Sequence, residues 1–272
     1  MKKCVIFYNS NNNKNIEILK KITRVLKSKK ISLETVCVID KCPFEIKADF
    51  AVSIGGDGTV LYASHYLVEK EIPLIAVKAG GLGFLSSIEV SEAEDFIRAY
   101  LKEEYKTINR SLLKINYKKK NFIALNDLVI KSKELRTFYT DIYYLNDYVS
   151  TYFSDGIIVS TPTGSTAYNL SSGGPIIHLH SKVMAVTPIS PHTLTHRPVV
   201  LPDTSLIKIY AREKYENHGG IVLSIDGQEN MEYDMSAVEI SVYEKFLKTI
   251  VPKKYSYFEV LRKKLSWGER DD

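Results

Sequence analysis

The sequence lacks the features that would place it in a membrane or in an oxidising compartment. Its 272 residues contain no run of about 18 to 20 consecutive apolar residues, the length that spans a bilayer. Residues 1–6 lack the apolar segment of a signal peptide. Cys4, Cys37 and Cys42 show no C-x-x-C spacing, so we interpret them as reduced and structural. These absences predict a cytoplasmic protein with no membrane partner.

Two common nucleotide-binding motifs are also missing. The chain has no G-x-x-x-x-G-K-[ST] P-loop, and no G-x-G-x-x-G segment opens a helix after a strand with an acidic residue about 20 positions later. Ordinary P-loop kinases and Rossmann dehydrogenases are therefore disfavoured. The pairs His178/His180 and His192/His196 lack acidic or cysteine partners at metal-site spacing, so we expect no metal bound by the protein itself.

The charge of the chain gives no reason to expect nucleic acid as a partner. The net charge is +5, but lysines and arginines are spread along the chain and are matched by acids. We interpret residues 118–120 as a solvated turn and residues 27–30 as a helix end favoured by the helix dipole.

The hydrophobic pattern divides the chain into an α/β part and a β-rich part. The length of the chain would also fit one large domain. Up to residue 105, short apolar runs alternate with helical patterns, which predicts βαβ units and an open, Rossmann-like sheet. Residues 106–253 carry closely spaced strand patterns and predict a β-rich, sandwich-like domain. Residues 254–272 return to helical spacing, so we expect a C-terminal helix that packs back on the first domain.

The clearest motif in the first part is Gly55-Gly56-Asp57-Gly58-Thr59, between an apolar strand and a helix. Glycines allow close backbone approach and a helix N-terminus offers free N–H groups, so this loop suits phosphate oxygens. A carboxylate would repel phosphates there. We therefore interpret Asp57 as a general base for an attacking hydroxyl, and the alternative is that it caps the helix.

A second glycine cluster, within residues 78–85, follows another apolar strand. It would lie beside the first loop at the carboxyl edge of the sheet, where ligands bind in such folds. The alternative is a simple tight turn.

Residues 160–175 contain an unusual number of serines and threonines, preceded by Asp155-Gly156 and an apolar strand. Ser165 is expected to cap a short helix that Gly173 and Pro175 terminate. Hydroxyls, free N–H groups and the Tyr168 ring would then surround the helix N-terminus, a surface that suits a nucleotide.

Asn126-Asp127 lies between apolar residues inside a predicted strand, where an amide and a carboxylate are costly unless each has a partner. Vicinal ribose hydroxyls would satisfy both groups. A β-bulge or a polar pair on an edge strand is the equal alternative.

Four motifs together closely resemble those of bacterial NAD kinases across nearly the whole chain. They are residues 55–59, 126–127, 155–175 and 226–228. The first is shared in similar form with diacylglycerol and sphingoid kinases and with phosphofructokinases, so the third decides between these families. The resemblance implies transfer of the γ-phosphoryl group of ATP, or of phosphate from polyphosphate, to the 2′-hydroxyl of the adenosine ribose of NAD. It also implies Mg²⁺ or another divalent cation carried by the donor, and a homotetramer or homodimer.

The resemblance further implies roles for individual residues. Asp57 would accept the proton of the 2′-hydroxyl, Asn126 and Asp127 would bind the ribose, and Asp155 would contact the nicotinamide half. The family holds the dinucleotide in a crevice between its domains, with some contacts from a neighbouring subunit. The other residues implied for NAD binding are Gly58, Thr166, Ala167, Tyr168, Ser171, Gln228 and, by approximate alignment, Arg136. The phosphate loop would comprise Gly55, Gly56 and Thr59, with His65 as a further candidate.

Two positions depart from the family pattern. Relatives often carry Asn in place of Lys78, and many carry Arg or Lys in place of Phe153. The lost cation at position 153 would weaken selection for substrates with an extra phosphate. Two other functions stay open at this point: a lipid kinase, which would need an apolar mouth that the sequence does not show, and a non-catalytic NAD(P)-binding protein, against which Asp57 argues.

Overall fold

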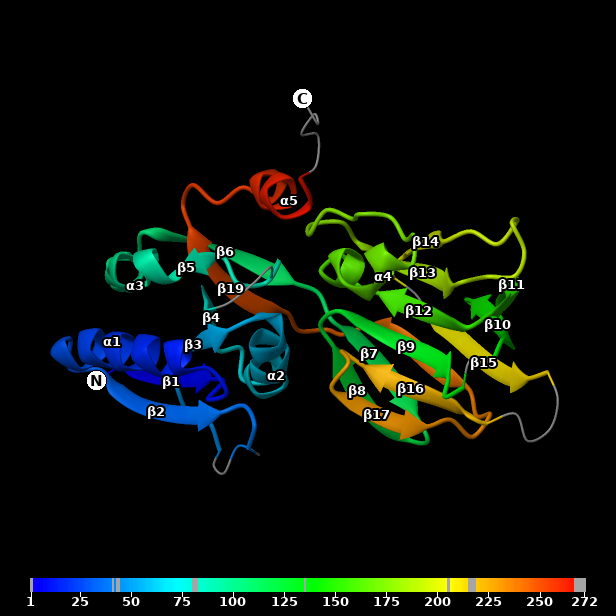
Figure 1. Cartoon of the computed structure of the whole chain (residues 1–272), viewed down its shortest axis with the longest axis horizontal. Helices are drawn as coiled ribbons and strands as arrows, with labels where there is room; N and C mark the ends of the chain where they lie inside the picture. The colour runs from blue at the N-terminus through cyan, green and yellow to red at the C-terminus, as the bar shows by residue number, and fades with distance from the viewer. Residues whose placement is uncertain are drawn as a thin grey trace. The chain divides into compact units, whose positions relative to one another are not determined.

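The structure of the chain falls into two units. The first comprises Met1–Asn109 and Phe246–Asp272, and the second comprises Arg110–Lys245 (Figure 1). The sequence predicts a return to the first domain at residue 254, whereas the structure returns at Phe246 because an apolar strand follows directly. The computed structural model describes residues 2–40, 42, 45–79, 83–134, 136–204, 206–214 and 219–266.

The first unit is built on a seven-stranded sheet with the order β2-β1-β3-β4-β19-β6, in which β5 also pairs with β4. β1 runs parallel to β2 and β3, and β4 runs parallel to β3, β5 and β19. The carboxyl ends of β1, β3 and β4 therefore share one edge of the sheet. The strands are β1 (Lys3–Tyr8), β2 (Ser32–Cys37), β3 (Phe50–Gly55), β4 (Leu74–Lys78), β5 (Ile88–Glu89), β6 (Tyr105–Arg110) and β19 (Leu247–Pro252).

Helices of the first unit pack on this sheet through apolar stripes. In the first helix, Ile18, Ile22 and Leu26 are buried in the same core as Phe50 and Val52 of β3. The described helices are α1 (Asn13–Ser28), α2 (Asp57–Leu67), η1 (Val90–Glu92), α3 (Ala93–Leu101) and α5 (Tyr257–Leu265). The predicted α/β domain and its returning C-terminal helix are thus confirmed.

The second unit is a sandwich of two six-stranded sheets, and its described strand pairs are all antiparallel. Apolar side chains of both sheets form one core, which confirms the predicted β-rich domain. One sheet contains β11 (Asp147–Ser154), β10 (Phe138–Tyr144), β15 (Ile207–Glu213), β18 (Val238–Val242), β7 (Leu113–Tyr117) and β8 (Lys120–Ala124). The other contains β14 (Val199–Pro202), β13 (Val183–Ile189), β12 (Gly156–Ser160), β9 (Asp127–Ser132), β16 (Ile221–Ile225) and β17 (Glu229–Glu232).

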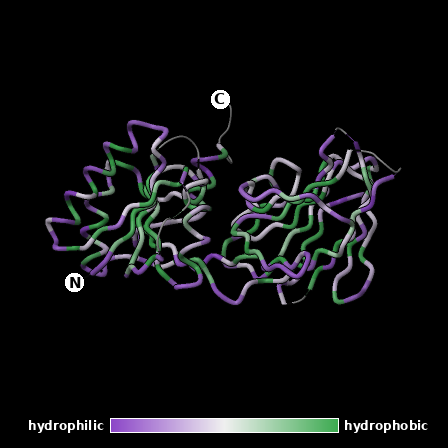
Figure 2. Tube along the Cα trace, turned by 90° about the horizontal axis from the view of Figure 1, so that it is seen from below, coloured by the Kyte–Doolittle hydropathy of each residue, from purple (hydrophilic) through white to green (hydrophobic). Residues whose placement is uncertain are grey.

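Strand burial follows the position of each strand. In β15, buried Ile207, Ile209 and Ala211 alternate with more exposed neighbours, as on a sheet with one face in solvent. β12 is buried along its whole length, and the short helices η2 (Gly164–Thr166) and α4 (Tyr168–Ser171) follow it. Figure 2 shows the hydrophobic stretches along the strands of both units, with hydrophilic residues concentrated in turns and along the outer helix. Among the described helices, none is long and apolar enough to cross a membrane.

Candidate active site

The glycine motif of the first unit lies where β3 ends and α2 begins. β3 ends at Gly55, and α2 begins at Asp57, with Gly56 as an N-cap that has no side-chain hydrogen bond. A Cβ atom on Gly55 would lie 2.2 Å from the Oγ1 atom of Thr59, so this close turn requires glycine. The N–H group of Thr59 in the first turn of α2 donates to the Gly56 carbonyl over 3.0 Å, and the positive end of the helix dipole at this turn favours a phosphate.

The carboxylate of Asp57 is held by the second glycine segment. The backbone N–H groups of Phe84 and Leu85 donate to its Oδ2 and Oδ1 atoms over 2.7 and 3.0 Å. A Cβ atom on Gly83 would lie 2.5 Å from Oδ1, so glycine is needed there too. The two glycine segments therefore meet at Asp57, which makes these contacts outside its own helix, and the cap position belongs to Gly56. Gly80, Gly81 and Leu82, which belong to the predicted cluster, lie outside the described residues.

Basic side chains gather at the same edge of the sheet. The Nζ atom of Lys78 at the end of β4 lies 3.1 Å from Oε1 of Glu89, and this hydrogen bond raises the pKa of the lysine. The pKa of Lys264 on α5 is lowered, first by burial and then by the neighbouring Lys78. The charges of Glu89 and Asp57 offset only part of this shift. The returning helix thus brings a second ammonium group close to Lys78 and Asp57. No local pattern in the sequence pointed to Lys264, because its position depends on how α5 packs.

His65 does not lie beside the glycine loop. It is in the last turn of α2, eight residues after Asp57, which corresponds to about 12 Å along the helix axis. The structure therefore separates it from the other phosphate-loop candidates.

In the second unit, the carboxylate of Asp226 holds the backbone of Asn126 and Asp127. In the sequence, Asp226 stood out only as part of the motif at residues 226–228. Asp226 accepts hydrogen bonds from the backbone N–H groups of Leu125, Asn126 and Asp127 over 2.8, 2.7 and 3.1 Å. Asp226 has a φ of 51° in the turn between β16 and β17, and the exposed Gln228 lies in that turn. An Asp-Gly pair directly after an apolar strand was the available signal for this turn.

The strand that carries Asp127 is central. β9 pairs with β12 on one side and β16 on the other, without a register shift. Neither a β-bulge nor an edge strand therefore accounts for Asp127. Asn126 lies in the bend before β9, so the prediction that both residues lie inside a strand is wrong for Asn126. Asp127 is only 5% exposed and faces the charge of Asp226.

Residues 160–175 pack directly against the Asn126 backbone. The N–H group of Thr161 donates to the carbonyl oxygen of Asn126 over 2.9 Å, and a Cβ atom on Gly164 would lie 2.0 Å from the same oxygen. Asn169 is fully buried, and its Nδ2 donates to the carbonyl oxygens of Ser165 and Pro175 over 3.1 Å each. The sequence did not identify Asn169, whose role depends on this loop geometry.

The hydroxyl groups in this segment differ from the prediction. Ser165 does not cap α4: its buried Oγ donates to the Pro162 carbonyl over 2.7 Å and accepts from the Ile177 N–H over 3.0 Å. The side chains that face outward are instead Tyr168, which is 41% exposed, and Ser171, with Ala167 half-buried and Thr166 buried. Most hydroxyl groups therefore form hydrogen bonds within the loop, and the exposed side chains lie in its C-terminal half.

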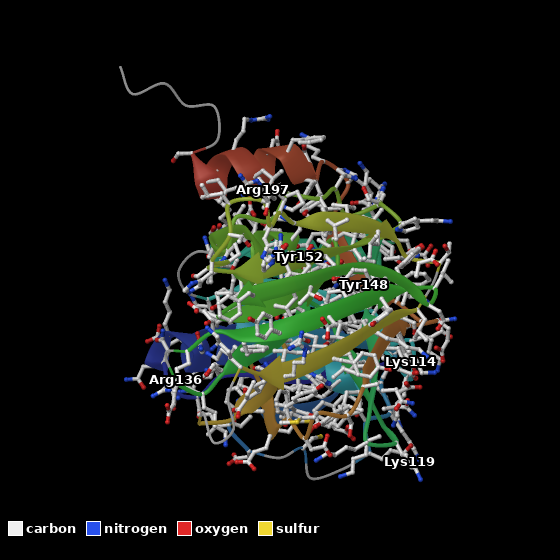
Figure 3. All side chains as sticks on the ribbon, turned by 90° about the vertical axis from the view of Figure 1, so that its right-hand side faces the viewer. Lys114, Lys119, Arg136, Tyr148, Tyr152 and Arg197 are labelled. Atoms are coloured by element: carbon white, nitrogen blue, oxygen red, sulfur yellow. The ribbon has the colours of Figure 1, made fainter. Side chains whose placement is uncertain are left out.

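Asp155 and Arg136 lie at the other end of this sheet. Asp127 pairs with Ser160 at one end of β12, whereas the N–H group of Ser132 donates to the Asp155 carbonyl at the opposite end. Five residues of strand separate the two ends by about 17 Å. Arg136 follows the same far end, with its Nε atom 3.4 Å from Oε2 of Glu134 (Figure 3). One copy of the second unit therefore does not bring these two residues to Asn126 and Asp127.

Phe153, where the family resemblance implies a cation, lies in an aromatic cluster. Its ring stacks on Tyr139 at 4.7 Å between centroids and lies 5.2 Å from the His192 ring. The Nζ atom of Lys214 lies 5.4 Å from the centre of the Phe153 ring. A positive charge is thus present beside position 153, although the side chain at that position is apolar.

The buried pair of acids predicts an unusual dependence of stability on pH. Burial, and then the charge of Asp226, raise the pKa of Asp127 from 3.8 to about 7. The folded protein therefore binds this proton more tightly than the unfolded chain, so the stabilisation is full below pH 3.8 and is lost as the pH rises through 7. Between pH 5 and 8 we expect the free energy of unfolding of the wild type to fall by about 3 kcal/mol. Urea denaturation of Asp127→Asn should not show this fall. Equal losses in both proteins would contradict the assignment.

Comparison with known proteins identifies the family. The model of the ATP-NAD kinase N-terminal domain matches residues 41–105, and the model of the C-terminal domain matches residues 125–250. The NAD kinase of Solibacter usitatus is 41% identical over 82% of this chain and 79% of its own length. The NAD kinase of Campylobacter lari is 35% identical over 96% of this chain and 93% of its own length. This chain belongs to the NAD kinase family.

Two solved structures show the same fold as this NAD kinase family member. Yeast NADH kinase complexed with NADH has a TM-score of 0.86 at 21% identity, and covers 100% of this chain and 89% of the yeast chain. An NAD kinase from Archaeoglobus fulgidus in complex with ATP has a TM-score of 0.80 at 22% identity, and covers 97% and 98% of the two chains. Membership of the family makes the chain a phosphotransferase with an alcohol acceptor. It favours NAD kinase activity over the lipid kinase alternative, which would also phosphorylate a hydroxyl group.

Proposed function

We propose that this chain transfers the γ-phosphoryl group of ATP to the 2′-hydroxyl of the adenosine ribose of NAD, which gives NADP. The observation that supports this most is the position of Asp57. It is a carboxylate at the first residue of a helix that follows a glycine turn, and two backbone N–H groups hold it. Such a loop binds phosphate, and a carboxylate within it suits a hydroxyl acceptor.

Asp57 is the general base in this proposal. Each carboxylate oxygen has a second lone pair, so Asp57 can accept a proton while the Phe84 and Leu85 N–H groups orient it. The 2′-oxygen attacks the γ-phosphorus, its proton passes to Asp57, and the bond from the γ-phosphorus to the bridging oxygen breaks to release ADP. The Gly55, Gly56 and Thr59 backbone would position the phosphates.

Residues of the second unit bind the dinucleotide in this proposal. Asn126 and Asp127 would pair with the ribose hydroxyls, because Asp226 and the segment after β12 fix the backbone that carries them. Tyr168 is exposed enough to stack on a base or a nicotinamide ring. The remaining proposed contacts are Gly58, Thr166, Ala167, Ser171 and Gln228.

A divalent cation is proposed to come with the donor. Within the described ranges, no three His, Cys, Asp or Glu side chains are grouped so that they could hold a metal ion. A cation such as Mg²⁺ bound to the donor phosphates would neutralise charge on the transferred group. Lys78 and Lys264 would add positive charge from the protein at the carboxyl edge of the sheet.

Asp155 and Arg136 are proposed to act on the dinucleotide of a second copy of the chain. About 17 Å of strand separates them from Asn126 and Asp127 within one second unit. The family resemblance implies a homotetramer or homodimer with contacts from a neighbouring subunit. A partner copy would supply the nicotinamide contact that one copy does not.

The proposed reaction is tested by supplying the purified protein with NAD, Mg²⁺ and each donor in turn. NADP formation is scored with a dehydrogenase that requires NADP. We expect NADP with ATP, and the same assay ranks other nucleoside triphosphates, polyphosphate and NADH as substrates. Phosphate transfer to a lipid and not to NAD, or tight NADP binding with no turnover under any donor or metal, would contradict the proposal.

A further inference from the structure

A basic pocket opens at the edge of the first sheet opposite to Asp57. It has a volume of about 850 Å³ and is lined by the start of β1, the end of α1 and the end of α3. The lining residues are Lys2, Lys29, Lys30, Ile31, Arg98, Leu101 and Lys102. Five of the seven are cationic, and none is acidic.

The five cations have no acidic partner within the described residues. Other lysines of this unit do pair, such as Lys70 with Glu45 at 3.1 Å and Lys248 with Glu71 at 2.9 Å. No ion pair or side-chain hydrogen bond joins any of the five to a described residue. Mutual repulsion among these groups is therefore not relieved by a direct ion pair with a described carboxylate.

The ends of two helices offset only part of this charge. Lys29 is the C-cap of α1 and Lys102 is the C-cap of α3, and each helix C-terminus carries about half a negative charge. Five cations less these two ends leave about four positive charges around one pocket. Lys30 has a φ of 57°, a conformation that favours glycine at this position after a helix, yet the residue is a lysine that lines the pocket.

The lining favours a phosphate chain over a nucleic acid. Among the described residues that line the pocket none is aromatic, so these residues offer bases no ring to stack on. Arg98 offers a planar group that can bind phosphate oxygens in pairs, and the lysines add point charges from separate segments. Ile31 and Leu101 supply only aliphatic surface.

The pocket is separate from the proposed catalytic edge. It lies at the start of β1, and Ser32 at the start of β2 donates its N–H group to the Lys2 carbonyl over 3.0 Å. Asp57 follows the opposite end of β3, which runs parallel to β1. Six residues of strand place the two edges about 20 Å apart.

We propose that this pocket is a second anion site that binds a linear oligophosphate, either a free chain or the phosphate tail of a nucleotide. The evidence is the convergence of five unpaired cations on one pocket without acids or aromatic rings. Binding there does not require the kinase reaction, so the two proposals can fail independently.

Titration calorimetry with inorganic tripolyphosphate at physiological ionic strength tests the proposal. The variant Lys29→Gln/Arg98→Gln is compared with Lys20→Gln/Lys21→Gln, which removes two exposed lysines of α1 that do not line the pocket. The wild type and the control should each bind at the pocket and at the donor loop, whereas the pocket variant should lose the pocket event or weaken it at least tenfold. Orthophosphate should bind the wild type at least tenfold more weakly than tripolyphosphate, because it spans fewer cations.

Several results would overturn the site. These are unchanged binding in the pocket variant, equal weakening in the control, or equal affinity for orthophosphate and tripolyphosphate. Tighter binding of tripolyphosphate than of ATP would support a free chain as the ligand, and equal affinity would support a nucleotide tail. NADP formation by the pocket variant without tripolyphosphate should equal that of the wild type. If the wild type, the pocket variant and the control all form no NADP but still bind tripolyphosphate as expected, only the proposed reaction is contradicted.

Discussion

Asp57→Asn should lower the turnover of NAD by about 10²- to 10⁴-fold, because an amide cannot take the proton of the attacking hydroxyl. The affinity for NAD should change little, since the proposed ribose partners Asn126 and Asp127 are untouched. Turnover is measured by NADP formation under saturating substrates, and NAD affinity by calorimetry. This separates the chemical step from binding.

Asp95→Asn is the matched control for this change. It removes the same charge from an exposed position on α3, and its turnover should equal that of the wild type. Thermal melting of both variants checks the fold, because the Asn side chain would place an N–H group opposite one of the N–H groups of Phe84 and Leu85. Undiminished turnover of a folded Asp57→Asn protein would remove Asp57 from the role of general base.

The inactive variant also tests the proposed second copy. If Asp155 acts on the dinucleotide of a partner, Asp57→Asn and Asp155→Ala damage different residues of each shared site. Co-expression would then assemble some sites with both residues intact, and activity above that of either variant alone is expected. Activity no greater than that of the better variant, in oligomers shown to be mixed, would contradict the sharing of Asp155.

Asp226→Ala should destabilise the second unit by more than about 3 kcal/mol, because it leaves the N–H groups of Leu125, Asn126 and Asp127 without their acceptor. A buried donor without a partner costs about 1 to 3 kcal/mol, and three are affected. Part of the loss is offset, since the charge that raises the pKa of Asp127 is removed. Urea denaturation measures the change in the free energy of unfolding.

NAD affinity provides the second measurement for Asp226→Ala. Under conditions where the variant is still folded, NAD binding should weaken by at least tenfold, because Asn126 and Asp127 lose the group that fixes their backbone. Asp147→Ala is the control, since Asp147 is exposed at the first residue of β11 and should change stability by less than about 0.5 kcal/mol. A stable Asp226→Ala protein with unchanged affinity would show that this carboxylate does not position the ribose-binding backbone.

The local hydrophobic pattern of the sequence was sufficient to predict the architecture of both units. Apolar runs that end in glycines predicted β3 and the loop at Gly55, because a strand buried on both faces needs continuous apolar residues. β19 was assigned to the wrong domain. Its pattern of Leu247, Ile250 and Val251 fits a buried strand in either unit, and only its pairing with β4 decides.

Candidate site residues were found where a polar group stands against the local pattern. Asp57 among glycines and Asp127 in an apolar strand are such cases. Contacts between distant segments were not found this way: Phe84 donates to a carboxylate 27 positions earlier, and Asp226 accepts from residues about 100 positions earlier. Ser165 shows the opposite error, since its hydroxyl bonds within the loop rather than to the helix end that its spacing indicated.

The order of strands in the first sheet has a consequence for synthesis of the chain on the ribosome. β19 lies between β4 and β6 in that sheet, yet it is made last, after the whole second unit. A nascent chain that has passed residue 242 but has not reached residue 247 contains every described strand of the second unit and lacks β19, an internal strand of the first. The β-sandwich can therefore complete its hydrogen bonding before β19 is made, whereas the α/β unit can close its sheet only after residue 252 has been made.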